Sequence, residues 1–142
     1  MSRVTIDFIE SATIISLLRS LGLTKYETLA YLSLIKNGPQ NRKSLTSLTE
    51  IPSGKIYTVV KNLTGEGWIR VSMNERPMIL YAVDPEVTIK KRIIELREKL
   101  NLLETNSSRV LAVLKPKYNN FYFANNSRKN EHYNIREKLM SL

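Results

Sequence analysis

The sequence predicts a mainly α-helical protein with one small β-ribbon. Residues 54–66 have the apolar spacing of a short amphipathic helix. Residues 68–73 and 78–83 follow at once and alternate apolar and polar side chains, as the strands of a hairpin do. Residues 84–115 carry apolar side chains alternately four and three positions apart, which is typical of a long helix with a narrow seam. A short helix followed by a tight ribbon is the layout of a winged helix-turn-helix domain, and the seam predicts a coiled-coil helix after it.

The helix predicted at 54–66 has clear limits. Pro52 cannot extend a preceding helix, Ser53 is expected to cap this one, and Gly65 and Gly67 are expected to end it. Its buried stripe is predicted to consist of Ile56, Val60 and Leu63, with Val59 at the margin. The opposite face carries side chains of the kind that reach phosphates and base edges, namely Lys55, Thr58, Lys61 and Asn62. An ordinary solvated helix shows the same face, so this pattern alone leaves both interpretations open.

Another amphipathic helix is predicted from Thr24 to Asn37. Thr24 and Glu27 have the spacing of a capping box, and Gly38 and Pro39 are expected to end the helix. Its core stripe is expected at Leu29, Leu32 and Ile35.

A short helix is then predicted at 42–49, capped by Asn41, with Leu45 and Leu48 facing inward. It opens with two cations, Arg42 and Lys43, at the positive end of its own dipole, which costs about 0.3 to 1 kcal/mol per charge when nothing offsets it. A DNA phosphate at this helix start would offset that cost, because it would meet two cations and free backbone amides together. The alternative is that these charges are simply solvated at a frayed end.

The ribbon adds two further cations. Residues 74–77 form the predicted turn, and Arg70 and Arg76 are placed to touch a DNA backbone or minor groove. Alternatively, Arg76 only keeps the loop tip soluble.

The long helix is predicted to begin sharply at Asp84, which can act as its cap, and to end at Pro116. Its seam is interrupted once, at Ser107, and otherwise consists of Ile89, Ile93, Leu96, Leu100, Leu103, Val110 and Leu114. A long helix with one narrow stripe needs a partner helix. We expect the same helix of a second chain, giving a two-fold dimer; the alternative is a fold back onto its own domain.

Both ends of the chain contain further predicted elements. Residues 6–21 read as an amphipathic helix ended by Gly22 and expected to pack against the long helix or its dimer mate; its apolar residues are Ile6, Ile9, Ile14, Leu17, Leu18 and Leu21. Near the other end, 121–123 read as a short strand and 129–142 as a final helix.

The winged unit also carries a family resemblance. The run LGLTKYETLAYLSLIKNGP, the leucine of KSLTSL and the run IPSGKIYTVVKNLTGEGWI resemble, in order and register, the N-terminal domain of the TrmB-like family of archaeal transcription regulators. The matching positions are Leu21, Gly22, Leu23, Thr24, Glu27, Gly38, Pro39, Ile51, Pro52, Lys55, Tyr57, Leu63 and Gly67. The resemblance implies sequence-specific DNA binding. It leaves Tyr57 open, either packed beside Leu45 or presenting its hydroxyl to a phosphate.

Residues 120–139 are similar to the opening of that family's sugar-binding domain. Because the sequence ends there, we expect a short form that lacks most of the sugar-binding domain, with no small-molecule effector assigned. The remnant is expected to cap the coiled coil or to offer a partner surface.

Composition adds few constraints. The formal charge of +9 favours polyanionic partners but is spread along the chain. Within 41–62, however, the cations outnumber the lone acid Glu50. The chain has no cysteine, no apolar run of membrane-spanning length and no signal pattern, so a cytoplasmic location with no membrane partner is the default. No cofactor, metal cluster or catalytic constellation is expected, so the chain is not expected to be an enzyme.

The sequence therefore predicts a sequence-specific DNA-binding transcription regulator that acts as a homodimer on double-stranded DNA. Its expected parts are a winged helix-turn-helix domain with an extra N-terminal helix (1–84), a dimerisation helix (85–116) and a strand-helix remnant (117–142). The predicted DNA contacts are Arg42, Lys43, Ser53, Gly54, Lys55, Tyr57, Thr58, Lys61, Asn62, Arg70 and Arg76. The alternatives are a winged-helix protein adaptor and a non-specific architectural DNA-binding protein.

Overall fold

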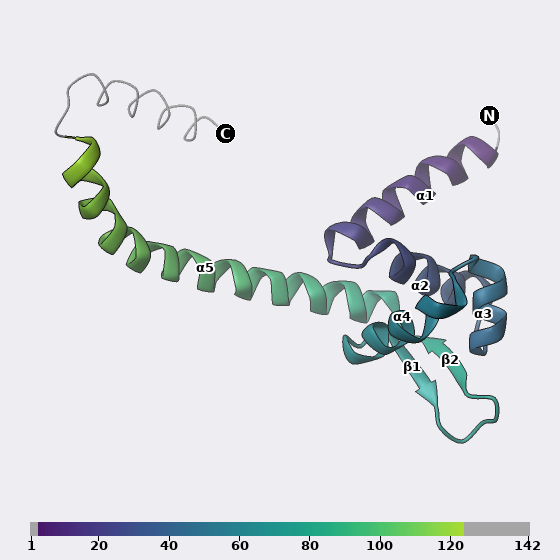
Figure 1. Ribbon diagram of the computed structural model, residues 1–142. Helices are drawn as coiled ribbons and strands as arrows, with labels where there is room; N and C mark the ends of the chain where they lie inside the picture. Colours follow the sequence, from purple (N-terminus) through teal and green to yellow (C-terminus); the bar gives the residue numbers. More distant parts are fainter. Residues whose placement is uncertain (1–2, 124–142) are drawn as a thin grey trace. The chain divides into compact units, whose positions relative to one another are not determined.

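A computed structural model describes the backbone of residues 3–123 and the side chains of residues 11–123 (Figure 1). The helices are α1 (Arg3–Ser20), α2 (Lys25–Asn37), α3 (Arg42–Thr49), α4 (Ser53–Gly65) and α5 (Pro85–Tyr122). The strands are β1 (Ile69–Ser72) and β2 (Ile79–Ala82). The mainly helical winged-helix fold with a long C-terminal helix is confirmed. The chain divides into two compact units between Glu95 and Leu96, and the first contains the whole winged domain.

The helix starts of α2 and α3 are those that the sequence predicts. Thr24 Oγ1 accepts a hydrogen bond from the Glu27 amide at 3.2 Å, and Glu27 Oε1 accepts one from the Thr24 amide at 3.0 Å, which completes the capping box. Asn41 Oδ1 accepts from the Ser44 amide at 2.8 Å and caps α3. Gly38, with φ of 83°, ends α2 as expected.

The start of α4 differs from the prediction. Ser53 is the first helical residue and Pro52 occupies the cap position, without a side-chain cap hydrogen bond. The Pro52 carbonyl instead accepts from the amides of Lys55 and Ile56, at 2.8 and 3.2 Å. The assignment of Ser53 as the cap is therefore wrong by one position, because the proline ring already fixes a backbone from which the helix can begin.

The core of the winged domain forms where α2, α3, α4 and β1 meet. The predicted stripe of α4 is confirmed, and Val59 is buried with it instead of lying at a margin; its members are Ile56, Val59, Val60 and Leu63. Leu45 of α3 is fully buried against them, whereas Leu48 is 57% exposed. The inward placement of Leu48 is wrong, because this short helix packs through one side only.

Helix α2 buries a different face from the one predicted. Leu29 and Leu32 are only half-buried and Ile35 is 45% exposed. The buried positions are Ala30, Tyr31 and Leu34, together with Glu27 and the small polar residues Thr28 and Ser33. The reason is that α2 contacts α1, α3, α4 and β2, so close neighbours surround it and small side chains fill positions that a stripe of leucines would overfill.

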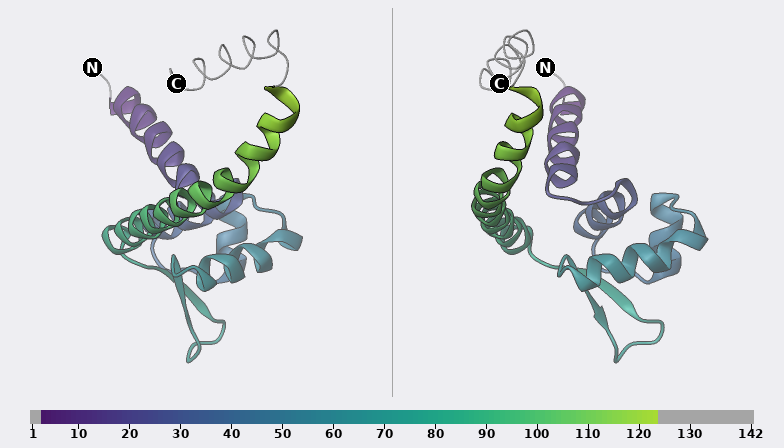
Figure 2. Two further views of the ribbon diagram at one scale, coloured as in Figure 1. Left: turned by 90° about the vertical axis from the view of Figure 1, so that its left-hand side faces the viewer. Right: turned by 60° about the vertical axis from the view of Figure 1, so that its left-hand side comes forward.

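The ribbon is an antiparallel pair in which Ile69 lies opposite Ala82 and Ser72 opposite Ile79. Gln40, in the link before α3, adds a bridge to Leu80 through backbone hydrogen bonds of 3.1 and 2.7 Å. The Gln40 side chain is buried and donates to the Ser33 carbonyl at 3.1 Å. These bonds tie the base of the ribbon to α2, while its far end projects beyond the helices (Figure 2).

The first turns of α5 are fixed to the winged domain. Asp84 Oδ1 accepts from the Glu86 amide at 2.9 Å, which confirms the predicted cap. The Tyr31 hydroxyl donates to the Val83 carbonyl at 2.8 Å and lies 3.2 Å from Thr88 Oγ1. Burial, partly offset by the Thr88 hydrogen bond, raises the pKa of Tyr31.

Aromatic and cationic side chains complete this junction. The Tyr31 ring meets the buried Trp68 edge to face, with 5.2 Å between centroids. Arg92 Nε donates to the Leu21 carbonyl at 2.7 Å, next to Gly22, whose φ of 108° ends α1 as predicted. Tyr31, Trp68 and Arg92 together join α2, β1 and the end of α1 to the start of α5.

Helix α1 buries only part of its predicted apolar stripe. Leu18 and Leu21 are buried, whereas Ile14 and Leu17 are each 43% exposed. The side chains of Ile6 and Ile9 lie outside the described residues. Packing of α1 against the long helix or a dimer mate stays a prediction.

Helix α5 does not stop at Pro116 but continues to Tyr122, so the predicted end is wrong. The strand predicted at 121–123 is wrong as well, because Phe121 and Tyr122 are helical. A proline removes one intrahelical hydrogen bond and leaves the turns after it able to form. Here Tyr118 stacks on Tyr122 at 4.6 Å, and the Lys115 ammonium lies 5.2 Å from the Tyr118 ring, so contacts one turn apart support the helix. The final helix predicted at 129–142 lies outside the described residues.

The contrast between Leu45 and Leu48 can be tested with one matched pair. Leu45→Ala should lower the free energy of unfolding by about 2 to 5 kcal/mol, because it empties a fully buried site. Leu48→Ala removes the same atoms from an exposed site and should change it by less than about 0.5 kcal/mol. Urea unfolding followed by circular dichroism measures both. Equal losses would contradict the orientation of α3.

Candidate nucleic-acid interface

The outer face of α4 carries the predicted polar side chains. Lys55, Thr58 and Lys61 are all exposed, on the side opposite the buried stripe. Since no acidic residue lies within α4, no carboxylate of this helix offsets the positive charge of the two lysines. Two cations and a hydroxyl on one solvent-facing helix are the chemistry that contacts phosphates and base edges.

Tyr57 connects this face to the start of α3. Its side chain is 63% exposed, which excludes the alternative of packing beside Leu45 in the core. The Arg42 guanidinium lies 5.7 Å from the centre of the Tyr57 ring, within the range of a cation–π interaction. The ring therefore constrains a cation that sits at the N-terminus of α3. Lys43, the neighbouring cation, is exposed.

The start of α4 is open to solvent. Ser53 and Gly54 are both exposed. A methyl group built on Gly54 would meet no heavy atom within 4 Å, so nothing in the domain covers the backbone there. The first two residues of α4 are thus open to solvent, as the prediction for these residues requires.

Asn62 has a different environment from the other residues of the predicted face. Its side-chain nitrogen donates to Oε2 of Glu27, 3.2 Å away, although the residue is otherwise exposed. Sequence reasoning assigned Glu27 only to the capping box of α2 and missed this second contact. No local signal marks it, because the two residues are 35 positions apart.

The wing carries an acid among its cations. Arg70 is exposed on β1, directly opposite Tyr81, and Arg76 is exposed in the loop. The Tyr81 hydroxyl donates to Glu75 Oε1 at 3.1 Å, and this bond is the main cause of the raised pKa of Tyr81. Glu75 thus places a negative charge in the ribbon and reduces the attraction of the wing for phosphates. The sequence prediction considered only the cations of the wing.

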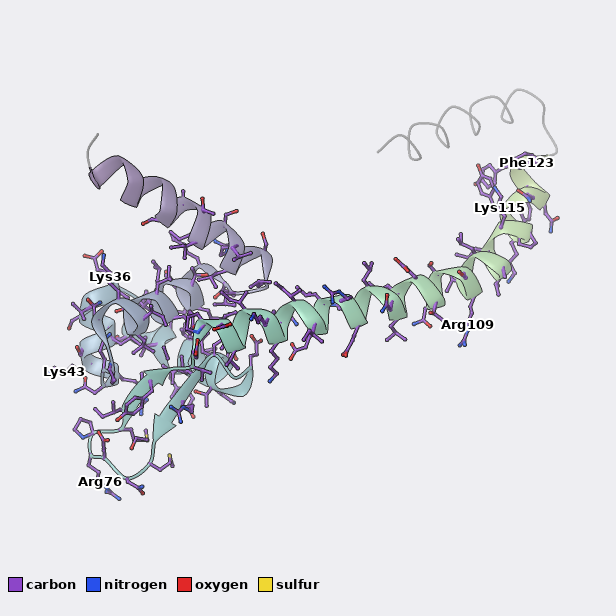
Figure 3. The ribbon with its side chains drawn as sticks, turned by 180° about the vertical axis from the view of Figure 1, so that it is seen from behind. Lys36, Lys43, Arg76, Arg109, Lys115 and Phe123 are labelled. Carbon is purple, nitrogen blue, oxygen red and sulfur yellow. The ribbon has the colours of Figure 1, made fainter. Side chains whose placement is uncertain are left out.

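A further exposed cation was not among the predicted contacts. In the view of Figure 3, Lys36, in the last turn of α2, lies along the same edge of the winged domain as Lys43 and Arg76. Its position in the sequence gave no reason to include it, because a lysine at a helix C-terminus is ordinarily explained by the helix dipole.

The predicted seam of α5 is uncovered along most of its length. Ile93, Leu100, Leu103, Val110 and Leu114 are each 41% to 55% exposed, and Ile89 and Leu96 are half-buried. The seam is therefore available to a partner helix. Among the side chains of residues 11–123, no three His, Cys, Asp or Glu are grouped as a metal site would need. Among the helices that the structure describes, none combines the length and the apolar character of a membrane span.

Comparisons with known proteins agree with this geometry. A family model described as "Sugar-specific transcriptional regulator TrmB" matches residues 18–86. The HTH-type sugar sensing transcriptional regulator TrmBL1 of Pyrococcus furiosus is 37% identical over 78 residues, which are 55% of this chain and 23% of that protein. The chain spans about a quarter to a third of the length of the curated relatives that it matches.

Solved structures share the fold. TrmBL2, an archaeal chromatin protein reported to bind DNA in a novel mode, is similar with a TM-score of 0.60 and 22% identity; the match covers 75% of this chain and 43% of that one. The transcriptional regulator Tm0710 from Thermotoga maritima has a TM-score of 0.50 and 22% identity, with 79% and 85% covered.

The matching family, TrmBL1 and Tm0710 are described as transcriptional regulators and not as enzymes, in agreement with the sequence prediction. The family match begins within α1 and ends at the first turn of α5, so it covers every element of the winged domain. Residues 18–86 of this chain, which form the winged helix, are therefore similar to the TrmB family of transcriptional regulators.

Proposed function

We propose that this chain is a sequence-specific, DNA-binding transcription regulator that acts as a homodimer. The observation that supports this most directly is the exposed polar face of α4, which the contact between Tyr57 and Arg42 links to the start of α3. In a helix-turn-helix domain, the second helix of the pair enters the major groove of duplex DNA. Here that helix is α4, and its outer face presents cations and a hydroxyl. A cytoplasmic location is part of the same proposal, since such a regulator must reach chromosomal DNA.

The position of each residue determines which part of the DNA it would contact. Lys55, Thr58 and Lys61 enter the major groove, where lysine and threonine side chains reach base edges and the nearest phosphates. Ser53 and Gly54 bring the free amides of the α4 start to the backbone.

Arg42 and Lys43 hold a phosphate at the start of α3. The Tyr57 ring limits the positions that the Arg42 guanidinium can adopt, which reduces the entropy lost when that phosphate binds. Arg70 and Arg76 contact the backbone beside the wing, with an affinity that Glu75 lowers.

Dimerisation would proceed through the exposed seam of α5, paired with the same helix of a second copy. The observation that favours it is the length of uncovered apolar surface on a helix of 38 residues. In a two-fold dimer the two α4 helices would read half-sites about 34 Å apart, one helical turn of DNA. The proposed parts of the chain are the winged domain with its N-terminal helix (1–84) and the dimerisation helix, which begins at 85 as predicted and continues past 116 to 122; no role is assigned to the segment after it.

The phosphate contacts at α3 can be tested by the salt dependence of DNA binding. Arg42→Ala combined with Lys43→Ala should weaken binding to all duplexes alike and lower the slope of log affinity against log salt by about 1.8, since each of the two protomers loses one phosphate contact and each contact removes about 0.9. Fluorescence anisotropy at several salt concentrations gives the slope. Lys90→Ala with Lys99→Ala removes two exposed cations from α5 and serves as the control. Equal slopes for the two double variants would contradict the assignment.

The dimer can be tested at the centre of the seam. Leu103→Asp places a charge where the two helices would meet, so the mass in solution should fall to the 16.4 kDa of one chain. Operator affinity should fall with it, because two half-sites would no longer be bound together. Asn101→Asp introduces the same charge at an exposed position outside the seam and should remain dimeric. Light scattering after gel filtration measures the mass. A monomeric native protein, or a dimeric Leu103→Asp variant, would contradict the proposed interface.

A further inference from the structure

Glu27 is the one buried carboxylate among the side chains that the structure describes, with 4% of its surface exposed. Both of its oxygens are engaged. Oε1 accepts from the Thr24 amide at 3.0 Å, and Oε2 accepts from the Asn62 side chain at 3.2 Å. A capping box needs only the first of these bonds, so the second calls for a separate explanation.

That second bond crosses between two helices. Glu27 lies in the first turn of α2. Asn62 lies near the end of α4 and directly follows Lys61 in the sequence. No salt bridge to Glu27 occurs within residues 11–123, so the carboxylate depends on hydrogen bonds for its stabilisation. A buried charge without such donors would be strongly unfavourable, which makes the position of the Asn62 amide important to the core.

The hydrogen bond between Asn62 and Glu27 can fix the rotation of α4 about its own axis, which the apolar stripe of α4 cannot do. Burial of Ile56, Val60 and Leu63 is favourable over a range of small rotations, because the hydrophobic effect has no preferred direction. A hydrogen bond does have one. Rotation of α4 about its axis by about 10° would move an atom at its outer radius of about 5 Å by about 1 Å. That displacement exceeds the tolerance of about 0.5 Å within which binding groups must be held.

We infer that Glu27 is a positioning residue for the DNA-reading helix, acting through Asn62. Asn62 then serves mainly to fix the rotation of α4, and Lys55, Thr58 and Lys61 carry the reading itself. This inference rests on the proposed DNA-binding function. It assigns to the capping box of α2 a second role, as the fixed point from which the outer face of α4 is aligned.

The experiment exchanges the donor, Asn62, and the acceptor, Glu27, of this hydrogen bond. Asn62→Asp places a second carboxylate at hydrogen-bond distance from Glu27 and removes the donor. Glu27→Gln keeps an oxygen for the Thr24 amide and provides a nitrogen that can donate to Asp at position 62. Glu27→Gln alone should be mild, because the Asn62 amide can turn and offer its oxygen to that nitrogen.

We expect Asn62→Asp to reduce affinity for a duplex selected from a random pool by about tenfold, within the range of coupling between contacting polar residues. In the Glu27→Gln background the same substitution should cost less than about threefold. Affinities are compared at a temperature where urea unfolding shows every variant to be folded, and each is expressed relative to a scrambled duplex.

Two results would overturn the inference. If Asn62→Asp costs the same in both backgrounds, Asn62 contacts DNA directly and Glu27 does not act through it. If the rescue appears in the free energy of unfolding but not in the ratio of selected to scrambled affinity, the bond is only structural. A native protein that does not distinguish the two duplexes would instead refute the proposed function, and the inference with it.

Discussion

The burial of one face of α4 is the constraint on which the rest of the structure depends. Ile56, Val59, Val60 and Leu63 are held against α2 and α3, so the opposite face can only be exposed. Burial of four such side chains contributes on the order of several kcal/mol, enough to outweigh the cost of collecting cations on the outer face. The ribbon, tied through Gln40, and the start of α5, tied through Tyr31, are arranged around this helix.

The elements of the fold follow from local signals. The capping box at Thr24, the cap at Asn41 and the turn at Gly38 act within a few residues, so the limits of α2 and α3 could be predicted from sequence. The buried face of α2 could not, because it depends on neighbours that surround the helix. The end predicted at Pro116 failed for a related reason: a proline weakens a helix locally, but aromatic contacts in the following turns sustain it.

The sequence was enough to predict which residues lie on the candidate site, but not the contacts that join them to other helices. Lys55, Thr58 and Lys61 lie on the exposed face that the periodicity indicates. The pairing of Arg42 with Tyr57 and the bond from Asn62 to Glu27 join residues far apart in the chain, and no spacing rule could find them. Both connections join α4 to another helix. The surface proposed to read DNA is therefore aligned by the domain behind it.

The central claim is that this surface reads DNA sequence as one half of a two-fold dimer. The most direct measurement is selection of bound sites from a pool of random duplexes, followed by sequencing. A two-fold dimer that reads DNA sequence should enrich an inverted repeat whose half-sites lie about one helical turn, or 34 Å, apart. Uniform recovery of all sequences would contradict it and favour an architectural DNA-binding role, and recovery of no DNA would favour a protein adaptor.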